Sequence, residues 1–157
     1  MVTPVHEMSK RPRIIPPAYF LAALVGMTGL HFTLPIATLI HPPYSYLGAV
    51  LVGCGLWIVI WAARLFSRAG TPIKPFEHST HLVTDGPYRF TRNPMYLGMV
   101  AILIGVAVLF GSLSPFLVIP AFVYVIQRHF ITLEEVALEK MFGEEYRRFK
   151  RNVRRWI

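Results

Sequence analysis

The sequence predicts an all-α integral membrane protein with four transmembrane helices, both termini in the cytosol and a C-terminal amphipathic interfacial helix. Hydrophobic residues make up 54% of the 157-residue chain and charged residues only 15%, whereas a soluble domain contains about 25% charged residues. Asp, Glu, Lys and Arg are absent from residues 14–63 and 93–127. Because a transmembrane helix needs roughly 20 apolar residues, each stretch is long enough for two. The length allows one domain, which we expect to cover residues 1–157.

Turn residues divide each apolar stretch into two predicted helices. Pro16 and Pro17 suit the first turn of a helix, where no N–H is needed. Residues 41–45, HPPYS, contain two prolines and indicate a turn. A second turn separates the last two helices, which are short and should extend into the interface or pack as a close hairpin. The four predicted spans are residues 17–40, 46–66, 95–110 and 116–130.

The basic residues indicate how these spans are oriented. All sixteen Lys and Arg lie in three segments: three before residue 14, five between residues 64 and 92, and eight from residue 128 onward. The two turns on the opposite side contain none, so the positive-inside rule places both termini and the middle segment in the cytosol. We expect a multi-pass protein, in the inner membrane if the chain is bacterial. The net charge of +8 fits anionic lipid head groups better than a nucleic acid partner.

The C-terminal residues 142–157 form a separate basic element. Tyr146, Phe149, Val153 and Trp156 recur at helical spacing and make one apolar stripe, while Arg and Lys occupy much of the remainder. Such a helix lies along a membrane surface or caps a bundle. We interpret its basic residues as an anchor rather than as groups that take part in chemistry.

The predicted spans contain few polar side chains. His31 is the ionisable side chain near the middle of a span, apart from Cys54 and the tyrosines. An intramembrane His is a candidate functional residue, but no span contains a partner carboxylate, so a hydrogen-bonded packing role is favoured. The chain has no Cys/His cluster of the zinc type, and we expect no metal site. It also has no phosphate-binding or dinucleotide-binding glycine motif.

Residues 81–98, HLVTDGPYRFTRNPMYLG, are unusual for a loop of a membrane protein. Two turn signals, DGP and NP, divide the segment, and Pro94 is well placed to open the third span. Tyr88, Arg89 and Arg92 can donate hydrogen bonds, and the N–H groups at a helix N-terminus favour anions. The loop therefore either holds a carboxylate or phosphate at the mouth of the third span or binds lipid head groups.

Residues 133–146, LEEVALEKMFGEEY, place Glu134 and Glu135 directly after the fourth span. Anionic lipids repel carboxylates, so this pair needs a cationic partner: Arg92, Arg128 or a cationic ligand. A structural salt bridge is the alternative interpretation. A turn of about five residues makes the third and fourth spans antiparallel neighbours. Since Arg92 precedes one span and Glu134 follows the other, we expect these two side chains to meet at the cytosolic face.

These two segments together resemble the isoprenylcysteine carboxyl methyltransferase family and its relatives, which include phospholipid N-methyltransferases. The resemblance is carried by LVTDGPYRFTRNPMYLG and by EE at residues 134–135 followed by FGEEYRRF. It covers roughly the C-terminal half, from Thr80 onward, and the first half matches only as apolar helices. The resemblance implies S-adenosylmethionine as the cofactor, bound at the cytosolic membrane edge by residues 71–157.

The resemblance also implies roles for individual residues. Arg92 would face the reacting centre, and Glu135 would support it. In this family a His is frequent where this chain has Asn93, which still offers hydrogen bonds. Members that act on prenylated cysteine have an Arg where this chain has Phe130, so Arg128 or His129 would contact the substrate instead. The residues implied to bind the cofactor are Thr80, His81, Leu82, Val83, Gly86, Tyr88, Asn93, Pro94, Met95, Tyr96 and Glu134.

The activity that the resemblance implies is methyl transfer to a lipidic or lipid-anchored acceptor. Carboxyl O-methylation of an isoprenylcysteine-like substrate is favoured over N-methylation of an ethanolamine head group or S-methylation of a small thiol. A carboxylate needs only a cationic group such as Arg92 to orient it, whereas an amine needs a proton acceptor, for which Glu134 or Glu135 is available.

Two alternatives belong to other classes of protein. A non-enzymatic scaffold needs no converging polar groups, and a small transporter should have repeated halves with polar groups at the membrane midplane. The sequence has neither repeats nor such polar groups. A nicotinamide-dependent reductase of the same fold would need a cofactor motif that does not occur in the sequence.

Overall fold

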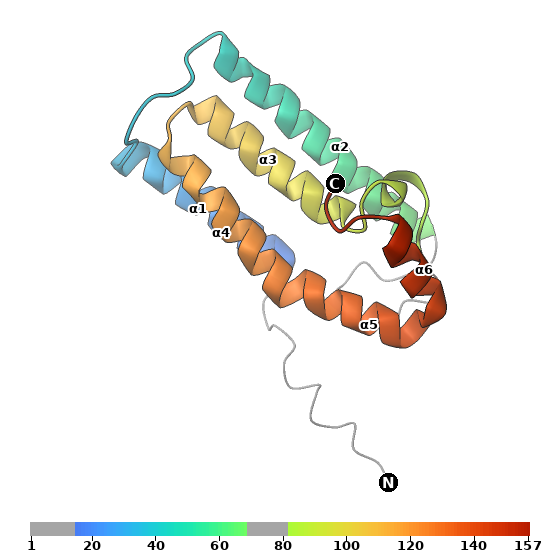
Figure 1. Ribbon diagram of the computed structural model, residues 1–157. Coiled ribbons are helices and arrows are strands. Elements are labelled where there is room, and N and C mark those ends of the chain that lie inside the picture. The colour runs from blue at the N-terminus through green and yellow to red at the C-terminus, as the bar shows by residue number, and fades with distance from the viewer. Residues whose placement is uncertain (1–14, 69–81) are drawn as a thin grey trace.

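The computed structural model describes residues 15–68 and 82–157. These residues form a helical bundle, and the prediction of an all-α fold is confirmed (Figure 1). The α-helices are α1 (Pro16–Thr33), α2 (Leu47–Arg68), α3 (Pro94–Phe110), α4 (Ser114–Ile126), α5 (Thr132–Phe142) and α6 (Glu144–Asn152). The shorter helical turns are η2 (Tyr44–Tyr46), η3 (Gly86–Arg89) and η4 (Gln127–Ile131), of which η4 is a π-helical turn.

Helix α1 ends at Thr33, well before the predicted end of the first span at residue 40. Pro35 explains the difference, because it lacks an N–H and disfavours the α conformation of the preceding residue. The segment after it runs beside the turn between α3 and α4, where the N–H of Leu39 donates to the carbonyl of Gly111 at 2.7 Å. The predicted span 17–40 was therefore wrong over its C-terminal part.

His31 lies at this same end of the bundle. Its Nδ1 is hydrogen-bonded to the Oγ of Ser112 at 2.7 Å, and its ring stacks on Phe110 with 4.5 Å between the ring centroids. These contacts join the last turn of α1 to the connection between α3 and α4.

Helices α2 and α3 are antiparallel and in backbone contact through four glycines. Gly55 lies against Gly98, and Gly48 lies against Gly105. A Cβ atom added to Gly55 would lie 2.7 Å from the carbonyl oxygen of Gly98, so no side chain fits between the two helices there. Small residues of this kind let transmembrane helices approach closely.

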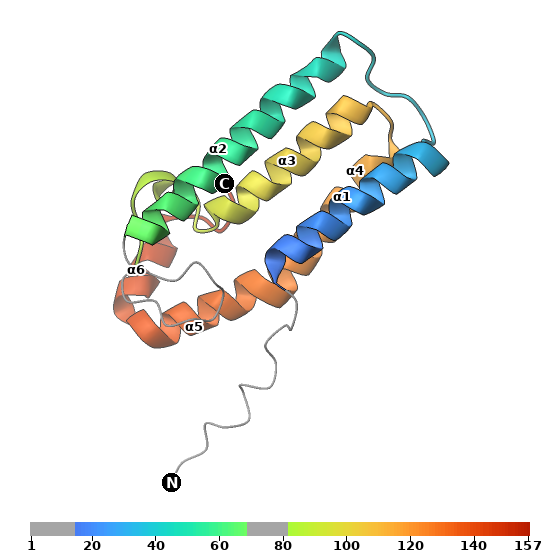
Figure 2. The same cartoon turned by 180° about the vertical axis from the view of Figure 1, so that it is seen from behind.

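The second pair of helices, α1 and α4, packs beside α3 (Figures 1 and 2). Met27 of α1, Leu103 of α3 and Ile126 of α4 are fully buried in the shared core. Helix α4 continues without a break through η4 into α5, which makes one helix of 29 residues from Ser114 to Phe142. This continuous helix carries α5 beyond the apolar core, toward the start of α3.

Two helical segments, Tyr44–Arg68 and Ser114–Phe142, are long and apolar enough to cross a membrane, and α3 is a shorter apolar helix. Large apolar side chains also face outward, among them Val25 at 73% exposure and Trp57 at 61%. Exposed apolar surface of this extent is typical of contact with lipid. The structure fits a membrane protein, whereas four spans and their orientation stay predictions. The charged helix α5 lies beyond the predicted fourth span.

The C-terminal element is a shorter helix than predicted. Helix α6 packs on α5 and buries Tyr146, which is 1% exposed. It ends at Asn152, and Val153 is already extended with φ −123° and ψ 131°. The prediction of one apolar helical stripe through Trp156 was therefore wrong after Asn152. Tertiary hydrogen bonds to the carbonyl groups of Arg154 and Arg155 replace the helical ones there.

The glycine contact between α2 and α3 generates the first prediction. We expect Gly55→Ala to lower the free energy of unfolding by about 1–3 kcal/mol, because the added methyl group meets backbone atoms that cannot move aside. Gly53→Ala is the matched control on the same helix, since its added Cβ meets no atom within 4 Å apart from its own stretch of helix backbone. This variant should be neutral or stabilising, because Ala has the higher helix propensity. Thermal unfolding in detergent measures both, and an equal loss in the two variants would contradict the close contact.

Candidate active site

The loop before α3 packs on the end of α2. Gly86 has a φ of 61°, and a Cβ there would lie 2.8 Å from a methyl group of Leu65. This tight contact brings Tyr88 against Phe66, with 5.5 Å between the ring centroids. Tyr88 is therefore buried, at 5% exposure. The loop thus places the side chain of Tyr88 inside the bundle, at the end where α3 begins.

The hydroxyl of Tyr88 has no hydrogen-bond partner among the described residues. Burial, together with the negative charge of Glu134, raises the pKa of this phenol above its ordinary value. Tyr88 therefore stays protonated and can donate a hydrogen bond. A buried donor without a partner costs free energy, so its position points to a polar ligand.

Glu134 is in the first turn of α5 and faces the start of α3. The hydroxyl of Tyr96 donates to its Oε1 at 2.8 Å. Burial raises the pKa of Glu134 to about 7; the hydrogen bond from Tyr96 opposes this increase and the charge of Glu135 adds to it. Within the described ranges, no Lys or Arg side chain forms a salt bridge with Glu134. The carboxylate is thus placed where a cationic ligand would stabilise it.

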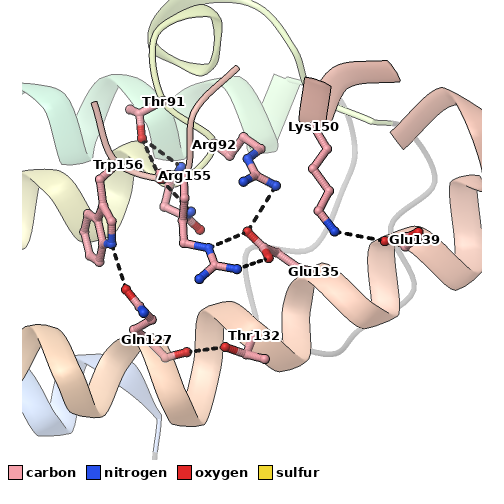
Figure 3. A network of polar contacts seen from close by, with 10 residues as sticks. Thr91, Arg92, Gln127, Thr132, Glu135, Glu139, Lys150, Arg155 and Trp156 are labelled. Atoms are coloured by element: carbon pink, nitrogen blue, oxygen red, sulfur yellow. Dashed lines mark hydrogen bonds and ion pairs between the residues drawn. The ribbon is translucent and has the colours of Figure 1, made fainter. Parts of the chain in front are cut away.

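The neighbouring carboxylate of Glu135 is shared by two arginines, Arg92 and Arg155 (Figure 3). Arg155 forms a fork, with Nε 3.0 Å from Oε1 and Nη2 2.6 Å from Oε2 of Glu135. Arg92 approaches from the other side, with Nη1 3.1 Å from Oε1. Glu135 is 6% exposed, and a buried charge is strongly unfavourable unless it is paired in this way.

Arg92 makes a weaker contact than Arg155. Its side chain is 9% exposed, yet its Nε and Nη1 form no hydrogen bond within the described part of the chain. The 3.1 Å approach to Glu135 is thus an ion pair without hydrogen-bond alignment. Arg92 therefore retains unused donors in a buried position.

The C-terminal segment holds the loop in place. The N–H of Arg92 donates to the carbonyl of Arg154 at 2.9 Å, and the Nδ2 of Asn93 donates to the carbonyl of Arg155 at 2.9 Å. The Oγ1 of Thr91 donates to that same carbonyl at 3.1 Å. The indole N–H of Trp156 reaches the Oε1 of Gln127 at 3.1 Å. Residues that follow α6 thus connect the loop to η4.

The structure brings together only part of the predicted site. It joins Tyr96 to Glu134 and Arg92 to Glu135, and the expected pairing of Arg92 with Glu134 is not formed. Glu134 and Glu135 are consecutive residues of α5, and consecutive side chains on a helix point about 100° apart, so only Glu135 contacts Arg92. Pro94 opens α3 as predicted.

Other predicted residues lie at the edge of this site or outside it. Leu82 lines an open groove of about 410 Å³ between the loop and α6, whose wall also contains Phe149. Val83 is half-buried in the same loop, and Met95 is half-buried in the first turn of α3. Thr80 and His81 lie outside the described residues.

The two residues predicted to contact the substrate lie in η4. Arg128 and His129 are exposed, and no hydrogen bond or ion pair of the described residues joins them to Glu134 or Glu135. Phe130 is instead turned inward, at 1% exposure, with its ring 5.5 Å from that of Tyr19. The position where the resemblance implied an Arg thus fills the core between α1 and the continuous helix from Ser114 to Phe142.

Sequence reasoning missed Arg155. It is one of eight basic residues that follow the fourth predicted span, and nothing in their pattern separates it from those that face solvent. The sequence did indicate that the two glutamates need a cationic partner. Arg92 and Arg128 were the candidates because they lie next to the ends of predicted spans, whereas Arg155 does not.

Comparison with known proteins gives the family. The phospholipid methyltransferase family model matches residues 44–145, about two thirds of the chain. The chain is 28% identical over 155 residues to the protein-S-isoprenylcysteine O-methyltransferase of Schizosaccharomyces pombe, covering 87% of this chain and 65% of that protein. It is 41% identical over 63 residues to an uncharacterised protein of Haemophilus influenzae, which is 40% of this chain and all of that protein. No solved structure matches.

The chain therefore belongs to the phospholipid methyltransferase family and is a methyltransferase. The resemblance read from the two sequence motifs is confirmed. Enzymes of this class in general take their methyl group from S-adenosylmethionine, and their membrane association agrees with the apolar helices.

The shared carboxylate of Glu135 generates a prediction about stability. Glu135→Gln should lower the free energy of unfolding by about 3 kcal/mol, the lower end of the range for breaking a buried ion pair, because Arg155 is partly exposed. The control is Glu139→Gln, which removes an exposed pair with Lys150 at 3.2 Å and should cost about 0–1 kcal/mol. Denaturant unfolding of purified protein measures both. Similar losses in the two variants would show that Glu135 does not anchor the C-terminal segment.

Proposed function

We propose that the chain transfers a methyl group from S-adenosylmethionine to a carboxylate of a lipidic or lipid-anchored acceptor, of the isoprenylcysteine type. The observation that carries this proposal is that neighbouring glutamates of α5 meet different groups: Glu134 has no cationic side-chain partner among the described residues, whereas Glu135 contacts Arg92, which is buried with unused donors. One site thus offers separate places for a cation and for an anion. The name of the fission yeast relative supports the same acceptor class.

The residues present fit S-adenosylmethionine, which carries a cationic sulfur, an amine, a carboxylate and ribose hydroxyls. Glu134 is suited to the amine or the ribose, and Tyr96 orients its carboxylate. The unpartnered hydroxyl of Tyr88 is a donor for an oxygen of the ligand. We assign the remaining cofactor contacts to the loop and the first turn of α3: Thr80, His81, Leu82, Val83, Gly86, Asn93, Pro94 and Met95.

When bound, S-adenosylmethionine supplies a methyl group that moves to the acceptor oxygen while its bond to sulfur breaks and the sulfur keeps the electron pair. No proton has to move when the acceptor is a carboxylate, so the residues of the chain need only position the reactants and exclude water. Arg92 is the group suited to orient the carboxylate. Glu135 supports Arg92 without touching the reacting atoms.

The charge of the cluster around Arg92 favours an anionic acceptor over a cationic one at that part of the site. Arg92 and Arg155 with Glu135 carry a net charge of +1, from two guanidinium groups and one carboxylate. This charge attracts a carboxylate and repels a protonated ethanolamine head group. N-methylation would also require a proton acceptor, for which Glu134 is the available group because its pKa is about 7.

A direct assay tests the reaction. Purified protein should bind S-adenosylhomocysteine in calorimetry and should form a methyl ester on a prenylcysteine analogue. The same assay with ethanolamine lipids and with small thiols provides the comparison. Transfer to an amine or a thiol, with none to the carboxylate, would contradict the proposed acceptor.

Two variants test the assigned roles. Glu134→Gln should weaken binding of S-adenosylhomocysteine by about 1.5–3 kcal/mol, the usual contribution of a charge-assisted contact. Arg92→Lys should leave that binding nearly unchanged and reduce turnover, because Lys keeps the charge but loses the planar fork. The opposite pattern would mean that the two roles are exchanged, and full activity in both variants would place the site elsewhere.

We further propose that the active site faces the cytosol and that both termini lie on that side of four membrane spans. This proposal rests on the segregation of all sixteen basic residues away from the two turns of the opposite face. An accessibility assay with a tag in residues 41–45 should show that turn on the far side. Labelling of the tag from the cytosol would reject this orientation.

A further inference from the structure

Arg92 and Arg155 share the carboxylate of Glu135 unequally. Arg155 occupies both carboxylate oxygens, through Nε at 3.0 Å and Nη2 at 2.6 Å. Arg92 has a single approach to Oε1 at 3.1 Å and no hydrogen bond from Nε or Nη1 within the described part of the chain. Figure 3 shows the two guanidinium groups on different sides of the carboxylate.

This inequality has a consequence for Arg92. A guanidinium and a carboxylate prefer a bidentate arrangement with two parallel hydrogen bonds. Glu135 is buried, and the fork of Arg155 takes up both of its oxygens. Arg92 therefore does not form its own fork with Glu135, and its Nε and Nη1 have no hydrogen-bond partner among the described residues.

We propose that Arg155 is a positioning residue for methyl transfer: by occupying both oxygens of Glu135, it keeps the guanidinium of Arg92 available to the anionic acceptor. This inference rests on the proposed function, in which Arg92 orients that acceptor. Without the fork of Arg155, Arg92 is free to pair fully with Glu135. If the Arg155 side chain is absent altogether, the net charge of the cluster falls from +1, for Arg92, Arg155 and Glu135, to zero, for Arg92 and Glu135.

The C-terminal segment has other attachments besides the Arg155 side chain. The carbonyl of Arg154 accepts from the N–H of Arg92, and the carbonyl of Arg155 accepts from Thr91 and Asn93. Trp156 adds a contact to Gln127 at 3.1 Å. A substitution of the Arg155 side chain therefore removes one of several attachments of the segment, and control variants are needed to separate its effect on Arg92 from its effect on docking of the segment.

The test is Arg155→Lys, assayed with the prenylcysteine analogue. Lys is a point charge and cannot occupy both oxygens of Glu135 in a fork. Turnover should fall about tenfold or more and the KM for the acceptor should rise, whereas the affinity for S-adenosylhomocysteine should stay within about twofold, because Glu134 and Tyr88 are not touched.

Two control variants separate positioning from docking of the segment. Arg154→Lys makes the same substitution at the neighbouring exposed side chain, which has no side-chain partner among the described residues. Trp156→Phe removes the hydrogen bond to Gln127 and loosens the same segment without touching Glu135. Both should retain turnover within about twofold of the unsubstituted protein.

A rescue experiment keeps the inference testable if Arg155→Lys is poorly folded. Arg155→Ala leaves a space of guanidinium shape beside Glu135, and millimolar guanidinium ions should restore part of its turnover. A role confined to packing would show no such recovery.

The inference is overturned if Arg155→Lys has normal turnover, if Trp156→Phe loses as much as Arg155→Lys, or if guanidinium restores nothing to Arg155→Ala. Failure of the proposed function looks different: the unsubstituted protein itself would then not bind S-adenosylhomocysteine or would not methylate the carboxylate.

Discussion

The buried carboxylate of Glu135 is the interaction on which this end of the structure depends. A carboxylate at 6% exposure needs compensating positive charge, since an unpaired buried charge costs several kcal/mol. Its two arginines come from distant parts of the chain: Arg92 precedes α3, and Arg155 follows α6. Pairing them with one residue of α5 fixes the loop, the C-terminal segment and the long helix relative to one another. Ion pairs therefore organise the polar end of the bundle, together with the packing of the loop on α2.

The apolar part of the bundle sets the other side of the site. Glycines let α2 and α3 approach at backbone distance, as at Gly55 and Gly98. Because the loop before α3 also packs on the end of α2, this close approach brings Tyr88 near the start of α3, where Tyr96 is hydrogen-bonded to Glu134. The short distance between α2 and α3 thus helps to place the hydroxyl groups of Tyr88 and Tyr96 at the same end of the bundle.

The sequence was sufficient for the features that depend on local pattern. Hydropathy and turn residues predicted the all-helical fold, and two motifs predicted the methyltransferase family. It was insufficient at two helix ends. Pro35 ends α1 within an apolar stretch by a local backbone effect that hydropathy does not register. At the end of α6, tertiary hydrogen bonds to the carbonyl groups of Arg154 and Arg155 compete with the local preference of an amphipathic segment for helix. Spacing placed Arg92 and the two glutamates at one face, yet the choice between Glu134 and Glu135 depends on the phase of α5. Arg155 has no distinguishing sequence pattern at all.

The adjacent glutamates illustrate why that phase matters for chemistry. Glu134 and Glu135 are the same residue type in the same helical turn, but they point about 100° apart and meet different surroundings. Glu135 is neutralised by two guanidinium groups, whereas Glu134 has a phenol as its partner and a pKa of about 7. Under the proposed function, Glu134 and Glu135 therefore have different roles. Only Glu134, which has no salt bridge among the described residues, would be stabilised by a cationic ligand. Binding of that ligand would then lower the pKa of Glu134 and leave the arginine cluster positive, so the site that receives a cation retains its attraction for an anion.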